Sequence, residues 1–432
     1  MGKVRIRPKG DQVIWILVLA FALISILAVF SSSTYLANKD GISKVTLFYQ
    51  QIKFVCMGFL ALLFCYMVPM RLYRATAFIV FGGTVLLLAM TYIPGLSTTR
   101  NGATRGVNIG GVTFQVFELA KVGLMLYLAK ALELWEDKLG TFKDFALKIL
   151  LPVGIVCLLV MGNSFSSALL FGFISFALLF FMGVNTRFLL ISIGGVAAAV
   201  ALLFGIYNVA FAGRTAEEGA EIGKVEKLFN RFGTVQQRFT SFFSEMSEEE
   251  MMENLSPAEK KKMLDDNRQS ENAKIAISEG GIIGKGPGKS TQRYSLSMAF
   301  SDFIFAFIVE EYGLLGGIFV ILLYTIFLFR CIRISNRCQT IFPAALVLGL
   351  SFLLATQAFL HIYVNIRLIP ITGHTLPLIS HGGTAYIVLS GAFGIILSVS
   401  RHLDRQERLA MQKRLAEEAA AIPATDYEPI NR

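Results

Sequence analysis

Long apolar runs alternate with short polar connections along most of the chain. A helix of about 20 apolar residues is long enough to cross the hydrocarbon core of a membrane. About ten such runs can be recognised, and they lie at 12–30, 52–70, 75–93, 112–132, 145–162, 164–183, 187–212, 303–330, 341–365 and 377–400. The pattern predicts an all-α polytopic membrane protein with about ten transmembrane helices.

The polar connections indicate how these helices are oriented. Lys and Arg gather in alternate connections, which the positive-inside rule explains if both ends of the chain are cytoplasmic. One connection is much longer than the others and would lie outside. The predicted parts are a cytoplasmic N-terminus (1–11), transmembrane spans 1–7 (12–212), a large extracytoplasmic loop (213–302), spans 8–10 (303–400) and a cytoplasmic tail (401–432).

The composition excludes several other classes of protein. Of the 432 residues, 54% are hydrophobic and 16% are charged, which is too apolar for a single soluble core. The basic clusters beside the spans account for the net charge of +10, so we expect no nucleic acid partner. The five cysteines show no CxxC spacing, so we expect neither disulfides nor a zinc site.

The long loop contains two helix-start signals. Ser247–Glu250 and Ser256–Glu259 both read as capping boxes, the second with Pro257 at the first helical position. They predict two short charged helices in the acidic insert 245–268. We interpret this insert as solvated surface, with docking of a partner as the alternative.

Two charged residues interrupt the fourth apolar run. A charge at the membrane centre costs roughly 2.5–3.5 kcal/mol, so it needs a partner or a function. Glu118 and Lys121 are three residues apart and therefore share one face of a helix. Two interpretations stay open: a structural ion pair, or a polar cavity lined by both side chains.

Acidic residues also mark the start of the eighth apolar run. Asp302 would lie at the outer membrane surface, with Glu310 and Glu311 two to three turns deeper. At about 100° per residue, Glu310 lies about 80° from Asp302 around a helix, whereas Glu311 lies about 180° away. We therefore expect only Glu310 to share a face with Asp302.

Glycine and lysine are concentrated just before that run, between Glu279 and Ser290. Glycines let backbone amides approach an anion closely, so the segment around Lys285 could hold a phosphate group. The spacing does not match a Walker P-loop, and a flexible turn is the alternative.

Other polar residues lie near the predicted membrane surfaces. Arg105 and Arg367 occupy outer connections, where anionic lipid groups would bind. His374 and His381 flank a Pro- and Gly-containing segment without further ligands at metal spacing, so we expect them to make structural hydrogen bonds.

Four motifs give the chain a resemblance to a known family. They are Asn101–Lys121, Ala276–Gly288, Ser301–Gly313 and Thr372–Thr384. In order and topology they resemble the shape, elongation, division and sporulation (SEDS) family of bacterial peptidoglycan polymerases, over nearly the whole chain. The resemblance implies a multi-pass protein of the bacterial cytoplasmic (inner) membrane.

The resemblance also implies a reaction. The substrate would be lipid II, a disaccharide-pentapeptide on undecaprenyl pyrophosphate, polymerised into glycan strands outside the membrane. Asp302 matches the catalytic acid of the family and would act as general base on a sugar hydroxyl. Cations would stabilise the pyrophosphate leaving group, supplied by Lys121, Arg105, Arg367 or a divalent metal such as Mg²⁺ or Mn²⁺.

The remaining motif residues receive supporting roles. Glu118, Lys285 and Ser380 are expected to bind the substrate together with the cationic residues named above. Glu310 and Glu311 are expected to have a structural or cation-binding role. The implied partners are a class B penicillin-binding protein, which crosslinks the strands, and membrane proteins of the divisome.

Alternative functions stay open at this point. We expect the septal, cell-division branch of the family, with the elongation branch as a close alternative. A lipid II flippase is the rival from another class, because many spans around Glu118 and Lys121 would also suit a transport path. A non-catalytic scaffold is the third reading.

Overall fold

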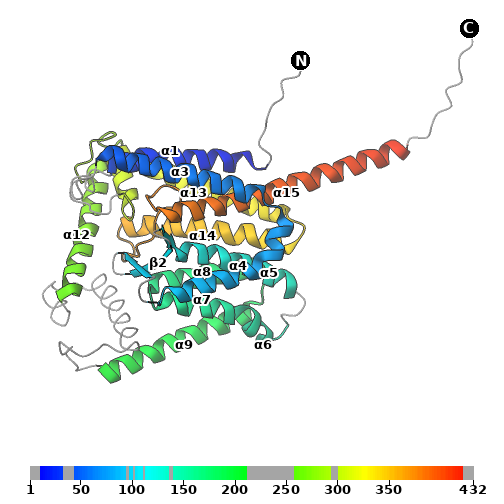
Figure 1. Cartoon of the computed structure of the whole chain (residues 1–432), viewed down its shortest axis with the longest axis horizontal. Helices are drawn as coiled ribbons and strands as arrows, with labels where there is room; N and C mark the ends of the chain where they lie inside the picture. Colours follow the sequence, from blue (N-terminus) through cyan, green and yellow to red (C-terminus); the bar gives the residue numbers. More distant parts are fainter. Residues whose placement is uncertain are drawn as a thin grey trace, which may run out of the picture.

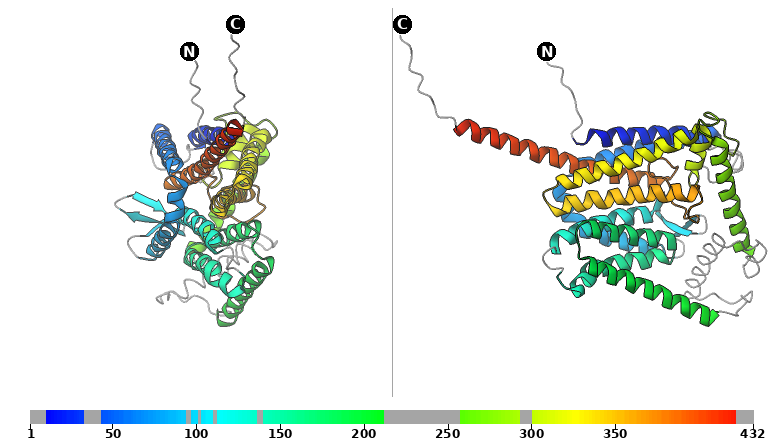
Figure 2. Two further views of the ribbon diagram at one scale, coloured as in Figure 1. Left: turned by 90° about the vertical axis from the view of Figure 1, so that its right-hand side faces the viewer. Right: turned by 180° about the vertical axis from the view of Figure 1, so that it is seen from behind.

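The computed structural model describes residues 10–32, 43–93, 97–100, 103–109, 112–135, 140–211, 257–292 and 300–421. Most of these residues are helical, and the long helices run side by side in one bundle (Figures 1 and 2). The helices are α1 (Gln12–Ser32), α3 (Lys44–Met67), α4 (Met70–Met90), α5 (Val116–Trp135), α6 (Phe142–Phe145), the π-helical turn η2 (Ala146–Leu150), α7 (Leu151–Met161), α8 (Phe165–Phe181), α9 (Thr186–Phe211), α12 (Pro257–Gly280), α13 (Ile304–Arg337), α14 (Ile341–Asn365) and α15 (Thr384–Ala421).

The helical membrane fold predicted from the apolar pattern is confirmed. Within the described residues, seven helical segments are long and apolar enough to cross a membrane, and α8 and the first part of α9 (Thr186–Ala198) are shorter apolar helices. Helix α5 is not among the seven. Its side chains are buried along most of its length, so protein rather than lipid surrounds its charged residues. The count of ten spans, the division into parts and the orientation of the ends stay predictions.

Local sequence signals explain where several helices begin. The hydroxyl of Ser43 accepts a hydrogen bond of 3.1 Å from the amide of Val45 at the start of α3. Ser164 caps α8 in the same way through the amide of Ser167, at 3.4 Å. Such caps satisfy amides that have no partner inside the helix. Helix α12 begins at Pro257, as the second capping box predicts, but it continues to Gly280, so the expectation of a short helix within 245–268 is wrong. The first box lies outside the described residues.

A small antiparallel sheet precedes α5, and the expectation of a purely helical chain missed it. Strands β1 (Ser97–Arg100), β2 (Ala103–Ile109) and β3 (Val112–Gln115) pair in the order β1-β2-β3, with Val107 opposite Phe114. The predicted fourth span, 112–132, is therefore wrong at its start, because its first four residues are β3. An apolar run cannot by itself distinguish a strand from the first turn of a helix.

Helix α13 is broken at Gly313, which the apolar pattern did not reveal. Gly313 has φ 69° and ψ −173°, a conformation that breaks an α-helix. The chain after α12 occupies the break: the amide of Leu314 donates to the carbonyl of Gly281 (2.9 Å), and the amide of Lys285 donates to that of Glu310 (3.0 Å).

The face relation expected between Asp302 and Glu310 is wrong. Residues 300–303 form a turn, and α13 starts only at Ile304. Asp302 therefore does not lie on the helix, and the 100° rotation per residue does not apply to it.

The two ends of the bundle differ. Helix α12 crosses one end, whereas α15 leaves the bundle at the other end and continues outward (Figure 1). The last predicted span, 377–400, is wrong at its start, because residues 377–383 are a loop, and α15 extends from Thr384 to Ala421. Charged residues beyond 400 continue the helix, because Arg, Glu, Gln and Lys are good helix formers.

Candidate active site

The turn that carries Asp302 is held by side chains from two other segments. Asn365 at the end of α14 donates its Nδ2 to the carbonyl oxygen of Asp302 at 3.1 Å, and its Oδ1 accepts from the amide of Ala306 at 2.9 Å. Asn365 is fully buried, whereas Asp302 is partly exposed. These two hydrogen bonds hold the backbone of the turn in place.

The segment before α15 holds the same turn from another side. Ser380 donates its hydroxyl to the carbonyl of Ser301 at 2.7 Å, and the amide of His381 donates to the carbonyl of Phe300 at 2.9 Å. The Ser380 hydroxyl also accepts from the amide of Leu376 at 2.8 Å and is buried. The predicted substrate-binding residue Ser380 therefore supports the Asp302 turn.

Of the two histidines of this segment, His381 makes the side-chain hydrogen bond that the sequence predicts, whereas the contact of His374 is made by its backbone carbonyl. Nδ1 of His381 lies 2.5 Å from Oε1 of Gln51 on α3. The carbonyl of His374 lies 2.8 Å from Nδ1 of His361, which is buried on α14. These contacts connect the loop to two helices.

Glu118 and Lys121 form a buried ion pair. Nζ of Lys121 lies 2.7 Å from Oε2 of Glu118 and donates to Oε1 of Gln357 on α14 at 2.6 Å. Gln357 in turn donates its Nε2 to the carbonyl of Thr375 at 3.0 Å. Since Glu118 is 7% and Lys121 only 2% exposed, the geometry favours the structural ion pair over the lining of an open cavity.

The small sheet also contacts the loop before α15. The backbone amide of Gln115, at the end of β3, donates a hydrogen bond to Oγ1 of Thr384 at 3.1 Å. The side-chain Nε2 of Gln115 donates to the carbonyl of Gly382 at 3.1 Å. Thr384 donates back to the carbonyl of Thr113 at 3.0 Å. Arg105 belongs to β2, but its side chain lies outside the described part of the structure.

The glycine-rich segment holds an anion that belongs to the protein itself. The carboxylate of Glu310 is 0% exposed and accepts hydrogen bonds from Lys285 Nζ (2.8 Å), from the Ser290 hydroxyl (2.5 Å) and from the amide of Thr291 (2.7 Å). Glu311 is 1% exposed and accepts from the amide of Gly288 at 2.8 Å. The groups expected to bind a phosphate around Lys285 are therefore already occupied. The Lys285 ammonium group and the amides of the segment bind the carboxylates of Glu310 and Glu311 instead.

The titratable groups of this segment that lie outside the spans are mutually stabilised. Hydrogen bonds from Lys285 and Thr291 lower the pKa of Glu279. Partial burial of Lys285 opposes its charge, but its hydrogen bonds to Glu279 and Glu310 raise its pKa. At neutral pH the segment therefore carries a charged lysine between two carboxylates. This arrangement supports the structural role predicted for Glu310 and Glu311.

Arg367 lies beyond the end of α14 and forms an ion pair with Glu271 on α12. Its backbone has φ 55°, a left-handed conformation that is uncommon outside glycine. The predicted substrate contact of Arg367 stays a prediction, and in the structure its side chain connects α14 to α12.

A metal site is not apparent among the residues that the structure describes, since no three His, Cys, Asp or Glu side chains gather there in a ligand group. The expectation of Mg²⁺ or Mn²⁺ stays untested.

Sequence reasoning missed the polar residues of α14. Gln357, His361 and Asn365 are all buried and each contacts one of the predicted motifs. Their spacing of four residues places them on one face of the helix. A polar stripe within the apolar run 341–365 was the signal that could have revealed them.

The architecture therefore defines a polytopic helical membrane protein in which the first motif contacts the fourth, the second contacts the third, and the fourth holds the turn at Asp302. A family model described as cell cycle protein, covering FtsW, RodA and SpoVE, matches residues 11–405. The chain belongs to this FtsW/RodA/SpoVE family, and the resemblance stated from the motifs is confirmed.

Individual relatives agree over nearly the full chain. A protein of Thioalkalivibrio sulfidiphilus named "Probable peptidoglycan glycosyltransferase FtsW" is 30% identical over 404 residues, covering 92% of this chain and 91% of the relative. A protein of Enterococcus hirae with the same name is 26% identical and covers 94% and 98%.

Solved structures share the fold. RodA of Thermus thermophilus, a rod shape determining protein, superposes with a TM-score of 0.61 at 23% identity, covering 91% of this chain and 97% of that one. A chain from a peptidoglycan synthase complex that coordinates polymerization and crosslinking superposes with a TM-score of 0.64 at 23% identity, covering 91% and 98%.

Proposed function

We propose that this protein is a peptidoglycan glycosyltransferase that polymerises lipid II into glycan strands during septal cell-wall synthesis. The family membership and the relatives named FtsW support the reaction and the division branch. The observation that carries the proposal for the site is the turn at Asp302, which Asn365 and Ser380 hold from two directions.

In this mechanism Asp302 is the general base. The hydroxyl at position 4 of one sugar attacks the anomeric carbon of the next, and the carboxylate of Asp302 accepts the hydroxyl proton. The bond from the anomeric carbon to the pyrophosphate oxygen breaks, and undecaprenyl pyrophosphate leaves with the electron pair. This leaving group is already stable as an anion, so a single carboxylate suffices where glycosidases use two.

The fixed backbone around Asp302 contributes to this step. A general base must lie within hydrogen-bond reach of the proton that it removes. Because two side chains hold the turn in place, less conformational entropy is lost when Asp302 is positioned in the transition state.

The proposal also covers location and partners. The protein would reside in the bacterial inner membrane with both ends cytoplasmic, and Asp302 would face outward. A class B penicillin-binding protein would crosslink the strands made here, and divisome membrane proteins would recruit the pair. The solved peptidoglycan synthase complex with the same fold supports such a pairing.

The test is polymerisation of lipid II by the purified protein together with its transpeptidase partner, read as glycan strands on a gel. Asp302→Asn should abolish strand formation, because an amide cannot accept the proton. Asp265→Asn is the matched control, since Asp265 is an exposed residue on α12. Strand formation by Asp302→Asn at the normal rate would refute the mechanism and favour the flippase reading.

A further inference from the structure

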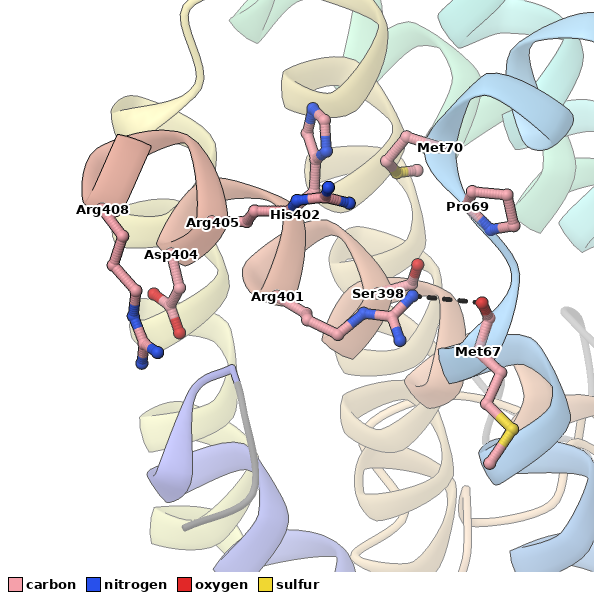
Figure 3. Close-up of a pocket in the computed structure, with 9 residues that line it drawn as sticks. All are labelled: Met67, Pro69, Met70, Ser398, Arg401, His402, Asp404, Arg405 and Arg408. Atoms are coloured by element: carbon pink, nitrogen blue, oxygen red, sulfur yellow. Dashed lines mark hydrogen bonds between the residues drawn. The ribbon is translucent and has the colours of Figure 1, made fainter. Parts of the chain in front are cut away.

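At the end of the bundle where α15 leaves it (Figure 1), residues between Met67 and Met70 and between Ser398 and Arg408 line a cavity of about 500 Å³. Its walls come from two places: the connection between α3 and α4, and the charged part of α15 (Figure 3). The connection is fixed to α15, because Ser398 donates its hydroxyl to the carbonyl of Val68 at 2.7 Å and Arg401 donates to that of Met67 at 3.1 Å. The cavity is therefore bounded by fixed backbone.

The cavity is strongly basic. Arg401, His402, Arg405 and Arg408 all line it. The charges of Arg71, Arg401 and Arg405 are close enough to act on the ring of His402. Several like charges near one another favour an anion in the space between them.

One acidic residue, Asp404, also lines the cavity, but its carboxylate and that of Glu407 already contact other groups (Figure 3). Oδ2 of Asp404 accepts from the amide of Gly10 at 3.0 Å, and its Oδ1 lies 3.8 Å from Arg337 on α13. Glu407 forms an ion pair with Arg337 at 2.7 Å. Among the residues that the structure describes, no acidic side chain pairs with Arg405 or Arg408. Their positive charges are available to a ligand.

The spacing of the arginines indicates the size of that ligand. Arg401, Arg405 and Arg408 lie within about 60° of one another around the helix and span about 10 Å along its axis. One phosphate group is too small to contact both ends of such a row. Two phosphates joined by a short linker have the required reach.

An apolar surface continues from the cavity along α3. Leu60, Phe64 and Met67 are 65%, 71% and 66% exposed and follow the spacing of one helix face. Met67 and Met70 also form the apolar wall of the cavity itself. This arrangement favours a lipid over a soluble phosphate, because acyl chains can lie on α3 while the head group enters the basic cavity.

We propose that this cavity is a binding site for an anionic phospholipid whose head group carries two phosphates. The arginines that line the cavity bind the two phosphates, and α3 receives the acyl chains. The site is separate from the Asp302 turn and does not depend on the proposed reaction.

The test measures lipid bound to the purified full-length protein by native mass spectrometry. The probes are cardiolipin, phosphatidylglycerol and phosphatidylcholine, titrated separately. Wild-type protein should retain cardiolipin about tenfold more tightly than phosphatidylglycerol and retain phosphatidylcholine least. The variant Arg405→Gln/Arg408→Gln should lose this preference.

The control removes the same charge from the same helix outside the cavity. Lys413→Gln/Arg414→Gln should keep the cardiolipin affinity within about twofold of wild type. An equal loss in both double variants would overturn the proposal, since it would indicate general attraction of a basic helix to anionic lipid. An unchanged affinity in the cavity variant would overturn it as well.

Two further measurements complete the design. Thermal unfolding checks that the cavity variant is folded. If that variant does not fold, Phe64→Ser tests the acyl-chain surface in its place and should lower the affinity for cardiolipin. Excess inorganic phosphate should not displace cardiolipin. Displacement of cardiolipin by excess inorganic phosphate would identify a site for free phosphate and contradict the lipid proposal.

Discussion

The side-chain amide of Asn365 donates a hydrogen bond of 3.1 Å to the backbone carbonyl of Asp302, across 63 residues of sequence. The other end of the same amide accepts from Ala306, in the first turn of α13. One buried side chain thus joins the end of α14, the Asp302 turn and the start of α13.

Asn365→Asp should impair catalysis more than substrate binding. An aspartate can still accept from the amide of Ala306, but its second oxygen would face the carbonyl of Asp302 and repel it. Losing a buried hydrogen bond costs about 1–3 kcal/mol, so we expect kcat of lipid II polymerisation to fall about tenfold or more with little change in KM. The control is Ser351→Ala, which removes a buried hydroxyl bonded only within α14. An equal effect of both substitutions would contradict the positioning role.

Removing one member of the buried ion pair should destabilise the protein. Lys121→Met leaves the carboxylate of Glu118 buried without its cation, at a cost of about 3–5 kcal/mol. The double variant Glu118→Gln/Lys121→Met should recover much of this loss in an unfolding titration. Lys148→Met breaks a more exposed pair with Asp144 and should lower the free energy of unfolding much less, because solvent screens exposed charges.

The same double variant separates the two readings of the pair. If the pair is structural, the folded double variant should polymerise lipid II at a rate close to wild type. A folded but inactive double variant would show that Glu118 or Lys121 contributes to substrate binding.

Gly313→Ala should destabilise the protein strongly. The added Cβ would lie 2.2 Å from the carbonyl oxygen of Ile282, and the residue would keep φ 69°. Strained backbone of this kind costs about 1–3 kcal/mol before the clash is counted. Gly172→Ala on α8 is the control, because its Cβ would meet nothing within 4 Å. Equal thermal unfolding midpoints for the two variants would contradict the described contact at the break in α13.

The glycine-rich segment should loosen in acid but not near neutral pH. The pKa of Glu279 is lowered from its ordinary 4.5, so its stabilising contribution is present above 4.5 and is lost as the pH falls through the lowered value. The pKa of Lys285 is raised from 10.5, so its contribution is present below 10.5 and is lost only in stronger base. Between these limits both groups are charged.

Amide hydrogen exchange of Gly288 and Thr291, corrected for the intrinsic rate, measures this effect. Protection should be constant between neutral pH and pH 4.5 and should fall as the pH is lowered further. In Lys285→Met the pH dependence should be weaker, because the partner of Glu279 is removed. Constant protection in the wild-type protein below pH 4.5 would contradict the prediction.

The sequence alone determined the features that depend on neighbouring residues. Apolar runs of membrane length predicted the helical membrane fold, because a single segment in lipid can pair its backbone N–H and C=O groups only by forming a helix. The spacing of three between Glu118 and Lys121 predicted their contact, and Pro257 after Ser256 predicted the start of α12. The four motifs predicted the family.

Only the tertiary structure decided which distant groups meet. The contact of Asn365 with Asp302 and the enclosure of Glu310 by Lys285 and Thr291 depend on how helices pack, and no period in the sequence records this. The break at Gly313 also escaped detection, although Glu310 and Glu311 lie just before it, because a single glycine within a long apolar run is compatible with a continuous helix. Hydropathy reports the preference of each residue for lipid or water, whereas a buried hydrogen bond depends on the position of its partner.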